Sequence, residues 1–167
     1  MADAIVLTRP VGVSFTGGDV TGLTITVING QPMLTLEDTT RSNKVLSVSE
    51  QVLVYAENRL SHFDWIRIST TSDAESGYVA DFDGTITSIT AHCENTVGNF
   101  KDIVVYVDNT SVATLGTLTG GANATINNQA VNIDFTQGQR IRLRAEGITS
   151  GQIEDTVIKL TIKWRES

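Results

Sequence analysis

The feature that most constrains this fold is a strict alternation of residue types in two stretches of the last third of the chain. In residues 140–145 every second position is arginine and the positions between are aliphatic. In residues 156–164 two lysines stand out of phase with isoleucine, leucine and tryptophan. A period of two residues is what a β-strand requires when one face is buried and the other is exposed. We therefore expect two amphipathic strands and an all-β fold.

The outward face of these strands carries the candidate site that the sequence singles out. Half of the 12 basic residues of the chain lie there, although its formal net charge is −7. They are Arg140, Arg142, Arg144, Lys159, Lys163 and Arg165. Rows of like charge destabilise neighbouring strands unless negative groups face them. Two hypotheses stay open: acidic residues that flank the strands screen the row, or the row is an interface that pairs with carboxylates of another protein.

Composition limits the class of protein. A chain of 167 residues with 40% hydrophobic and 19% charged residues suits one globular domain, or one with a smaller companion. The acidic balance argues against nucleic acid as a partner. The lone Cys93 predicts a small buried residue rather than a disulfide or zinc ligand. No secretory signal or membrane-spanning stretch is recognisable, so we expect synthesis in the cytoplasm and no membrane partner.

The spacing of strand-like segments and turns in the second half of the chain predicts an antiparallel β-sandwich. Turn signals such as Asp83-Gly84 and Gln137-Gly138 separate short segments that favour strands. The expected strands are residues 78–82, 85–93, 102–108, 111–115, 130–135, 139–146 and 156–164. A sheet of so many short strands must close or split into two layers, and an antiparallel jelly roll fits best.

The first half is expected to form a smaller β-rich segment. Asn29-Gly30 between alternating stretches predicts a hairpin, and Pro32 suits an edge strand. Residues 44–60 are ambiguous, because a capping-box pattern favours helix whereas β-branched residues favour strand, the option we prefer. The polar loop 72–77 is the natural boundary. It divides the chain into an N-terminal docking segment, 1–72, and a jelly-roll domain, 73–167.

No arrangement of residues predicts catalysis, a cofactor or a metal. Asp81 and Asp83 alternate beside a glycine, but the sequence then enters a strand and lacks the remaining ligands of a calcium loop. His92 is expected on the outward side of its strand rather than in a catalytic set. A sugar site would need aromatic platforms, for which the chain offers Tyr55, Trp65, Tyr78, Tyr106 and Trp164.

Several motifs of the second half resemble a domain common in virion proteins of tailed bacteriophages. The resemblance is carried by the Asp81–Ile86 turn and strand, by Ala91–Asn95, by the stretch from Lys101 to Asn109, and by Asn132–Arg144 with the closing strand from Asp155 to Leu160. It covers roughly residues 45–165. These motifs are typical of the fold rather than of a site.

The resemblance implies a non-enzymatic structural protein of the virion, made in the host cytoplasm and assembled on the particle. It implies a capsid decoration or head-fibre protein that binds the particle as a homotrimer, with the major capsid protein or other virion proteins as partners. A tail-fibre or collar appendage, or a receptor-binding tip whose partner is a host-surface glycan, is the alternative. The absence of a long shaft from this chain favours the decoration or head-fibre role.

Overall fold

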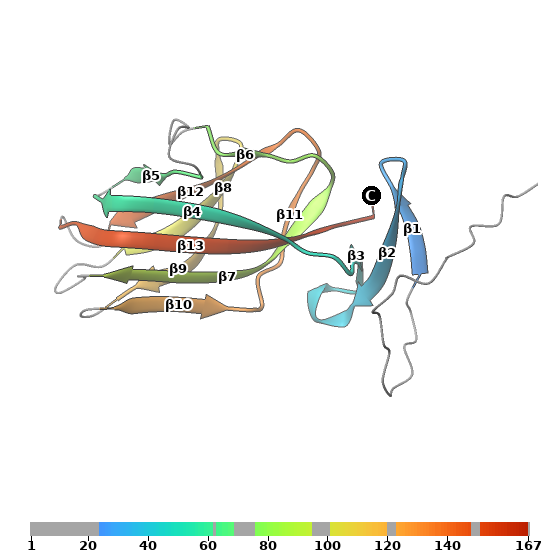
Figure 1. The fold of residues 1–167 in the computed structure, drawn as a ribbon, viewed down its shortest axis with the longest axis horizontal. Coiled ribbons are helices and arrows are strands. Elements are labelled where there is room, and N and C mark those ends of the chain that lie inside the picture. Colours follow the sequence, from blue (N-terminus) through green and yellow to red (C-terminus); the bar gives the residue numbers. More distant parts are fainter. Residues whose placement is uncertain are drawn as a thin grey trace, which may run out of the picture.

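The computed structural model describes residues 24–61, 63–68, 76–94, 101–119, 123–147 and 151–166. Within these ranges the regular structure is antiparallel β-sheet, apart from the 3₁₀ turn Thr39–Arg41. Figure 1 shows a two-layered sandwich and, beside one end of it, a small separate sheet. The expected all-β class is confirmed. No helix among the described residues has the length and hydrophobicity to cross a membrane.

The small sheet is N-terminal and has the order β1-β2-β3. Its strands are β1 (Thr24–Ile28), β2 (Gln31–Asp38) and β3 (Lys44–Ser47). The predicted hairpin is confirmed: Asn29 and Gly30 form the two-residue connection of β1 and β2, with φ of 47° and 79°. Positive φ at both positions is the requirement of the turn that matches strand twist, and it explains the Asn-Gly pair.

Pro32 does not lie in an edge strand as the sequence predicted. It lies in β2, the middle strand, opposite Val27 of β1. The proline is tolerated because β3 pairs with β2 only from Thr35 to Asp38 and does not reach Pro32. Its missing N–H therefore removes no bond to β3.

The sandwich consists of two antiparallel sheets. One has the order β10-β7-β13-β4, with β11 also paired to β7, and the other has the order β5-β12-β8-β9, with β6 also paired to β12. Its strands are β4 (Gln51–Leu60), β5 (Asp64–Ile66), β6 (Tyr78–Val79), β7 (Gly84–Glu94), β8 (Lys101–Val107), β9 (Thr110–Leu118), β10 (Ala124–Asn128), β11 (Ile133–Phe135), β12 (Arg140–Gly147) and β13 (Ile153–Trp164).

The path of the chain through these sheets is that of a jelly roll. β5 and β6 pair with the same side of β12, and β10 and β11 pair with the same side of β7, so each pair acts as one interrupted strand. Eight strand positions result, four in each sheet. The chain changes sheet at nearly every connection, and β8–β9 is the hairpin that stays in one sheet. This wrapping of two four-stranded sheets confirms the expected jelly roll.

A dry core fills the space between the sheets. Ile89, Ile158 and Leu160 of one sheet and Val105 and Leu143 of the other have no exposed surface. A hydrogen bond also joins the two layers. Tyr55 of β4 is fully buried, and its hydroxyl donates to the backbone oxygen of Ile141 in β12 at 2.8 Å. Burial raises the pKa of this phenol, so it remains a neutral donor.

The structure resolves some expectations and corrects others. Residues 44–60 form β3 and β4, so the strand interpretation is correct. The strand Ala124–Asn128 lies between the expected strands 111–115 and 130–135, where the sequence predicted none. The boundary predicted near residue 72 lies outside the described residues, but β4 and β5, which precede it, are sandwich strands. The sandwich therefore takes in part of the segment that the sequence assigned to docking.

Candidate interaction surfaces

The six basic residues singled out by the sequence do not form one face. Three of them lie on β12, in one sheet, and two on β13, in the other, so their outward sides point in opposite directions. The sequence interpretation treated the two strands as neighbours. It was wrong because β12 and β13, although consecutive in the chain, belong to opposite layers of the jelly roll. Arg165 lies beyond β13 and forms an isolated bridge with Leu46 of the N-terminal sheet.

Arg142 is buried, which contradicts the expected outward guanidinium. Its exposed fraction is 5%. Its Nε donates to the backbone oxygen of Asp108 at 3.1 Å, and one terminal nitrogen donates to the same oxygen and to Asn109 Oδ1. The Arg142 Cζ also lies 4.2 Å from the ring centroid of Trp65. The contact with the Trp65 ring and the hydrogen bonds to the acceptors offset the free-energy cost of burying the guanidinium. Arg142 therefore holds the β8–β9 turn in place.

Arg144 is half-buried in a group of aromatic rings. Its Cζ lies 4.5 Å from the ring centroid of Phe63, 5.4 Å from Trp65 and 5.6 Å from Tyr106. Glu146 accepts a hydrogen bond from the Tyr106 hydroxyl and lies 3.7 Å from Arg144 Nε. The bond to Glu146, with burial, raises the pKa of Tyr106. These contacts fit the screening hypothesis for the arginines of β12.

The remaining basic candidates have different surroundings. Arg140 is half-buried, and its terminal nitrogen lies 3.5 Å from Asn109 Oδ1. Lys163 Nζ lies 3.5 Å from a carboxylate oxygen of Glu50. Lys159 is exposed on the outward side of β13. A role of any of these residues in an interface stays a prediction.

Arg41 connects the N-terminal sheet to the sandwich, and the sequence had not singled it out. Its guanidinium donates to three backbone oxygens of the sandwich at 2.6–2.8 Å. These are the oxygens of Thr87, Gln129 and Val131. It also pairs with Asp38 at 2.6 Å. Asp38 caps the 3₁₀ turn that carries Arg41, by accepting from the backbone N–H of Thr40. A turn at the end of β2 thus positions one cation against three carbonyls.

Asp134 is the second polar connection between the two parts. It accepts from Lys44 of β3 and from Thr85 of β7, both at 2.7 Å, and Arg165 Nε lies 3.6 Å away. Burial raises the pKa of the Asp134 carboxyl, but the bonds from Lys44 and Thr85 outweigh it, and the pKa is lowered. Asp134 therefore remains a carboxylate that joins three segments of the chain.

The end of β13 adds to the N-terminal sheet. Trp164 donates its backbone N–H to Ser47 Oγ at 3.0 Å, and the N–H of Glu166 donates to the Val45 oxygen at 3.2 Å. Figure 1 shows β13, in red, running out of the sandwich toward β3. One strand therefore takes part in both units, which fixes the small sheet at the end of the sandwich.

One face of the N-terminal sheet is apolar and open. Pairing across the strands places on it the aliphatic residues Ile25, Val27, Leu34, Leu36 and Val48, with exposed fractions from 37% to 63%. Leu46, on the same face, is buried. A sheet with an apolar face needs a second layer to cover that face. No other described element covers these five side chains.

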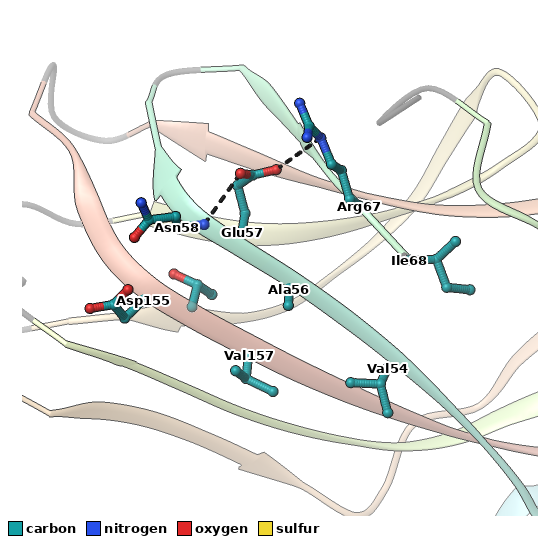
Figure 2. A pocket seen from close by; sticks show the side chains of 9 residues that line it. Val54, Ala56, Glu57, Asn58, Arg67, Ile68, Asp155 and Val157 are labelled. Carbon is teal, nitrogen blue, oxygen red and sulfur yellow. Dashed lines mark hydrogen bonds and ion pairs between the residues drawn. The ribbon is translucent and has the colours of Figure 1, made fainter. Parts of the chain in front are cut away.

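A second apolar area follows the edge strand β4. Val52 and Val54 of β4 and Val157 of β13 are 51%, 45% and 41% exposed. A groove of about 560 Å³ runs beside them, and Figure 2 shows the ion pair of Glu57 and Arg67 along its border. Most of the surface that lines the groove is apolar, so the groove suits another polypeptide better than a polar small molecule.

The other motifs of the sequence have structural roles. Asp83 accepts from the backbone N–H of Gln137 at 2.8 Å and so joins two turns. His92 is exposed on β7, as expected. Cys93 is buried, and burial raises its pKa to about 11. Among the described residues, no three potential metal ligands of the His, Cys, Asp or Glu type lie together.

The fold and its surfaces define a jelly-roll β-sandwich with a small N-terminal sheet at one end. No protein-family profile matches the chain, and no curated protein sequence matches it. The resemblance to bacteriophage virion proteins therefore stays a prediction.

Proposed function

We propose that this protein is a non-enzymatic structural protein of a bacteriophage virion, a capsid decoration or head-fibre protein that binds the particle as a homotrimer. The observation that carries the proposal is the open apolar face of the N-terminal sheet. The face is held rigidly by Arg41, Asp134 and the end of β13. An apolar surface that no other described element covers, next to a self-contained sandwich, is what we expect if the small sheet docks on a partner and the sandwich is displayed.

The charges of the molecule support docking through this face. The five exposed aliphatic residues carry no charge. The charged residues on the same face of β2 and β3, Asp38 and Lys44, are paired with Arg41 and Asp134, and Lys163, which lines a pocket with Leu36 and Val48, is paired with Glu50. A chain of net charge −7 repels acidic surfaces at most places. The apolar face is where a partner, such as the major capsid protein, approaches without that repulsion.

Docking is tested by adding purified protein back to particles that lack it. We expect Val27→Asp with Leu34→Asp to weaken binding to the particle by at least about tenfold, since a buried carboxylate costs well over 1.4 kcal/mol. The control is Val112→Asp on β9, because Val112 is 42% exposed and lies far along the chain from the docking face. Unchanged binding of the double variant, with its fold intact by circular dichroism, would refute docking through this face.

The position on the virion is tested by counting copies with quantitative mass spectrometry. A copy number comparable with that of the major capsid protein supports decoration. A number far below it supports the alternative, a collar or tail appendage. The mass of the purified protein by light scattering tests the trimer, and a monomer at all concentrations would contradict it.

The aromatic group at Trp65 is the observation that favours the alternative of a receptor-binding tip. Phe63 is half-exposed, and Trp65 and Tyr106 pack edge to face at 4.9 Å. However, the guanidiniums of Arg142 and Arg144 occupy faces of these rings that a sugar would need. If the protein binds sugars on a glycan array and the Phe63→Ala variant does not, the result would favour a receptor-binding tip over capsid decoration.

A further inference from the structure

The edge of β4 differs from the other sandwich edges because, among the described residues, only the bridge of Ala56 to Arg67 covers it. Residues 51–56 have the sequence Gln-Val-Leu-Val-Tyr-Ala, with no charge, proline or glycine. Natural proteins usually protect an edge strand with charges, proline, bulges or a covering element, since an open edge pairs with other strands. An unprotected edge of this composition is typical of a strand that has a partner.

The other three edges are each interrupted or covered. β9 has two register shifts against β8, which twist its edge. β5 and β6 are short pieces that pair with different parts of β12. β10 lies so close to β9 that a Cβ on Gly116 would collide with Ile126. By contrast, β4 pairs with β13 without any register shift from Gln51 to Leu60.

The backbone groups of β4 that point away from β13 can be identified. The N–H of Ala56 donates to the oxygen of Arg67 at 2.8 Å, on the side away from β13. Since the direction of backbone groups repeats every second residue, those of Glu50, Val52 and Val54 point the same way. The bridge to Arg67 is the last pairing on that side among the described residues, and none of them pairs with the edge from Glu50 to Val54.

The two ends of this open edge carry opposite charges. The Glu50 side chain is 52% exposed, and the Arg67 side chain, beyond the other end, is 50% exposed. An antiparallel copy of the same edge would therefore place Glu50 of each chain beside Arg67 of the other. Between them, Val52 of one copy would face Val52 of the other, and Val54 of each copy would lie opposite Glu50 of the other. Such a surface is self-complementary about a two-fold axis.

We propose that β4 pairs with β4 of a second copy of this chain, antiparallel about a two-fold axis at Val52. Residues Glu50, Val52 and Val54 of each copy exchange backbone hydrogen bonds with Val54, Val52 and Glu50 of the other. The pairing joins two sandwiches through one continuous sheet. The pairing requires neither a particle nor the N-terminal face, and together with the proposed trimer it gives an even-numbered assembly in which two trimers are joined.

The first test is native mass spectrometry of the purified protein. The chain has a mass of 18.0 kDa, and we expect species that contain an even number of copies. Val54→Pro removes an outward N–H, which an edge strand tolerates, and should halve the mass of these species. Val54→Lys should weaken the pairing in the same direction, with Val112→Lys as the control. Wild-type protein with only odd numbers of copies would overturn the proposal.

A second test reports the geometry and does not depend on a variant that disrupts the backbone. Residues opposite each other in a hydrogen-bonded pair have Cα atoms about 5.5 Å apart, which a disulfide can span. Val52→Cys should therefore form a disulfide-linked dimer on mild oxidation, whereas Val112→Cys should not. The native Cys93 is buried and does not compete. Equal amounts of dimer from both variants would refute the pairing.

The charges provide a third test. Glu50→Arg alone and Arg67→Glu alone should each weaken self-association, because like charges then meet at both ends. A mixture of the two variants should restore it, since each end again pairs opposite charges. Failure of the mixture to recover even-numbered species would contradict the antiparallel arrangement.

Discussion

The sandwich and the N-terminal sheet are built from the same unit, an antiparallel strand with alternating aliphatic residues, but they use their apolar faces differently. In the sandwich each sheet covers the other, so Ile158 and Leu160 face Val105 and Leu143 with no solvent between. In the N-terminal sheet the corresponding face, with Val27 and its neighbours, stays open. Burial in the first case stabilises the fold. In the second, no other described element covers the face, and this is the face for which we propose docking.

The two regions are also attached in different ways. The sandwich holds itself together by apolar packing, whereas the small sheet is attached by polar contacts: Arg41 to three carbonyls, Lys44 to Asp134, and the end of β13 to β3. Apolar packing is insensitive to pH, and polar contacts are not. Mutations and pH should therefore affect the two regions separately.

The largest difference is expected between Leu160→Ala and Leu34→Ala. Leu160 has no exposed surface, so its truncation should lower the free energy of unfolding by about 2–5 kcal/mol. Leu34 is on the open face, and its truncation should cost less than about 1 kcal/mol. Urea unfolding of the purified protein measures both. Equal losses would show that the N-terminal face is already covered in solution.

The attachment of the small sheet is tested by Arg41→Met. Each charged hydrogen bond contributes about 1.5–3 kcal/mol, and the substitution removes the Arg41 donor from three backbone carbonyls. We expect amides of β1 and β2 to exchange with deuterium roughly 10–100 times faster, while those of β13 in the sandwich keep their rates. Arg59→Met is the control, because Arg59 is exposed and 4.0 Å from Glu154. Faster exchange throughout the molecule would contradict a local role.

The sequence predicted the sandwich better than its surfaces for a physical reason. Alternation decides which side of a strand is buried, and it correctly placed Ile141 and Leu143 in the core. It does not decide which sheet a strand joins, because that depends on contacts between distant segments. The basic residues of β12 and β13 were therefore assigned to one face, although they lie on two.

Arg142 and Lys101 illustrate a second limit. Both are buried, and only the structure reveals the groups that compensate them. Arg142 meets the Trp65 ring and the Asp108 carbonyl, which are 77 and 34 residues away in the chain. Burial lowers the pKa of Lys101, and the nearby Asp64 opposes this effect. The sequence did not single out Arg41 for the same reason: nothing in its local sequence indicates the three carbonyls that it binds.

Arg142→Met tests the difference between buried and exposed basic residues within the sandwich. Loss of the guanidinium leaves the Asp108 oxygen without its donor and removes the stacking on Trp65. We expect the free energy of unfolding to fall by about 1–3 kcal/mol. Lys159→Met, at an exposed position of β13, should change it by less than about 0.5 kcal/mol. Similar effects of the two variants would mean that Arg142 is not held as described.

The smallest effect is expected from pH, and it should act on the attachment of the small sheet. The pKa of Asp38 and that of Asp134 are both lowered from 3.8, because hydrogen bonds to Thr40 and Arg41, and to Lys44 and Thr85, outweigh burial. The unfolded chain then binds protons more readily than the folded one. The stability from these carboxylates is fully present above about pH 5 and is lost as pH falls through the lowered pKa values.

Asp134→Asn should therefore reduce the drop in melting temperature between pH 5 and pH 3, although it lowers the melting temperature at pH 7. Asp155→Asn is the control, since Asp155 is exposed and asparagine tolerates its φ of 48°. Exchange of the amides of β1 and β2, measured at both pH values, should report the same loss locally. A drop with pH that is the same in wild type and Asp134→Asn would mean that the carboxylate does not hold the small sheet to the sandwich.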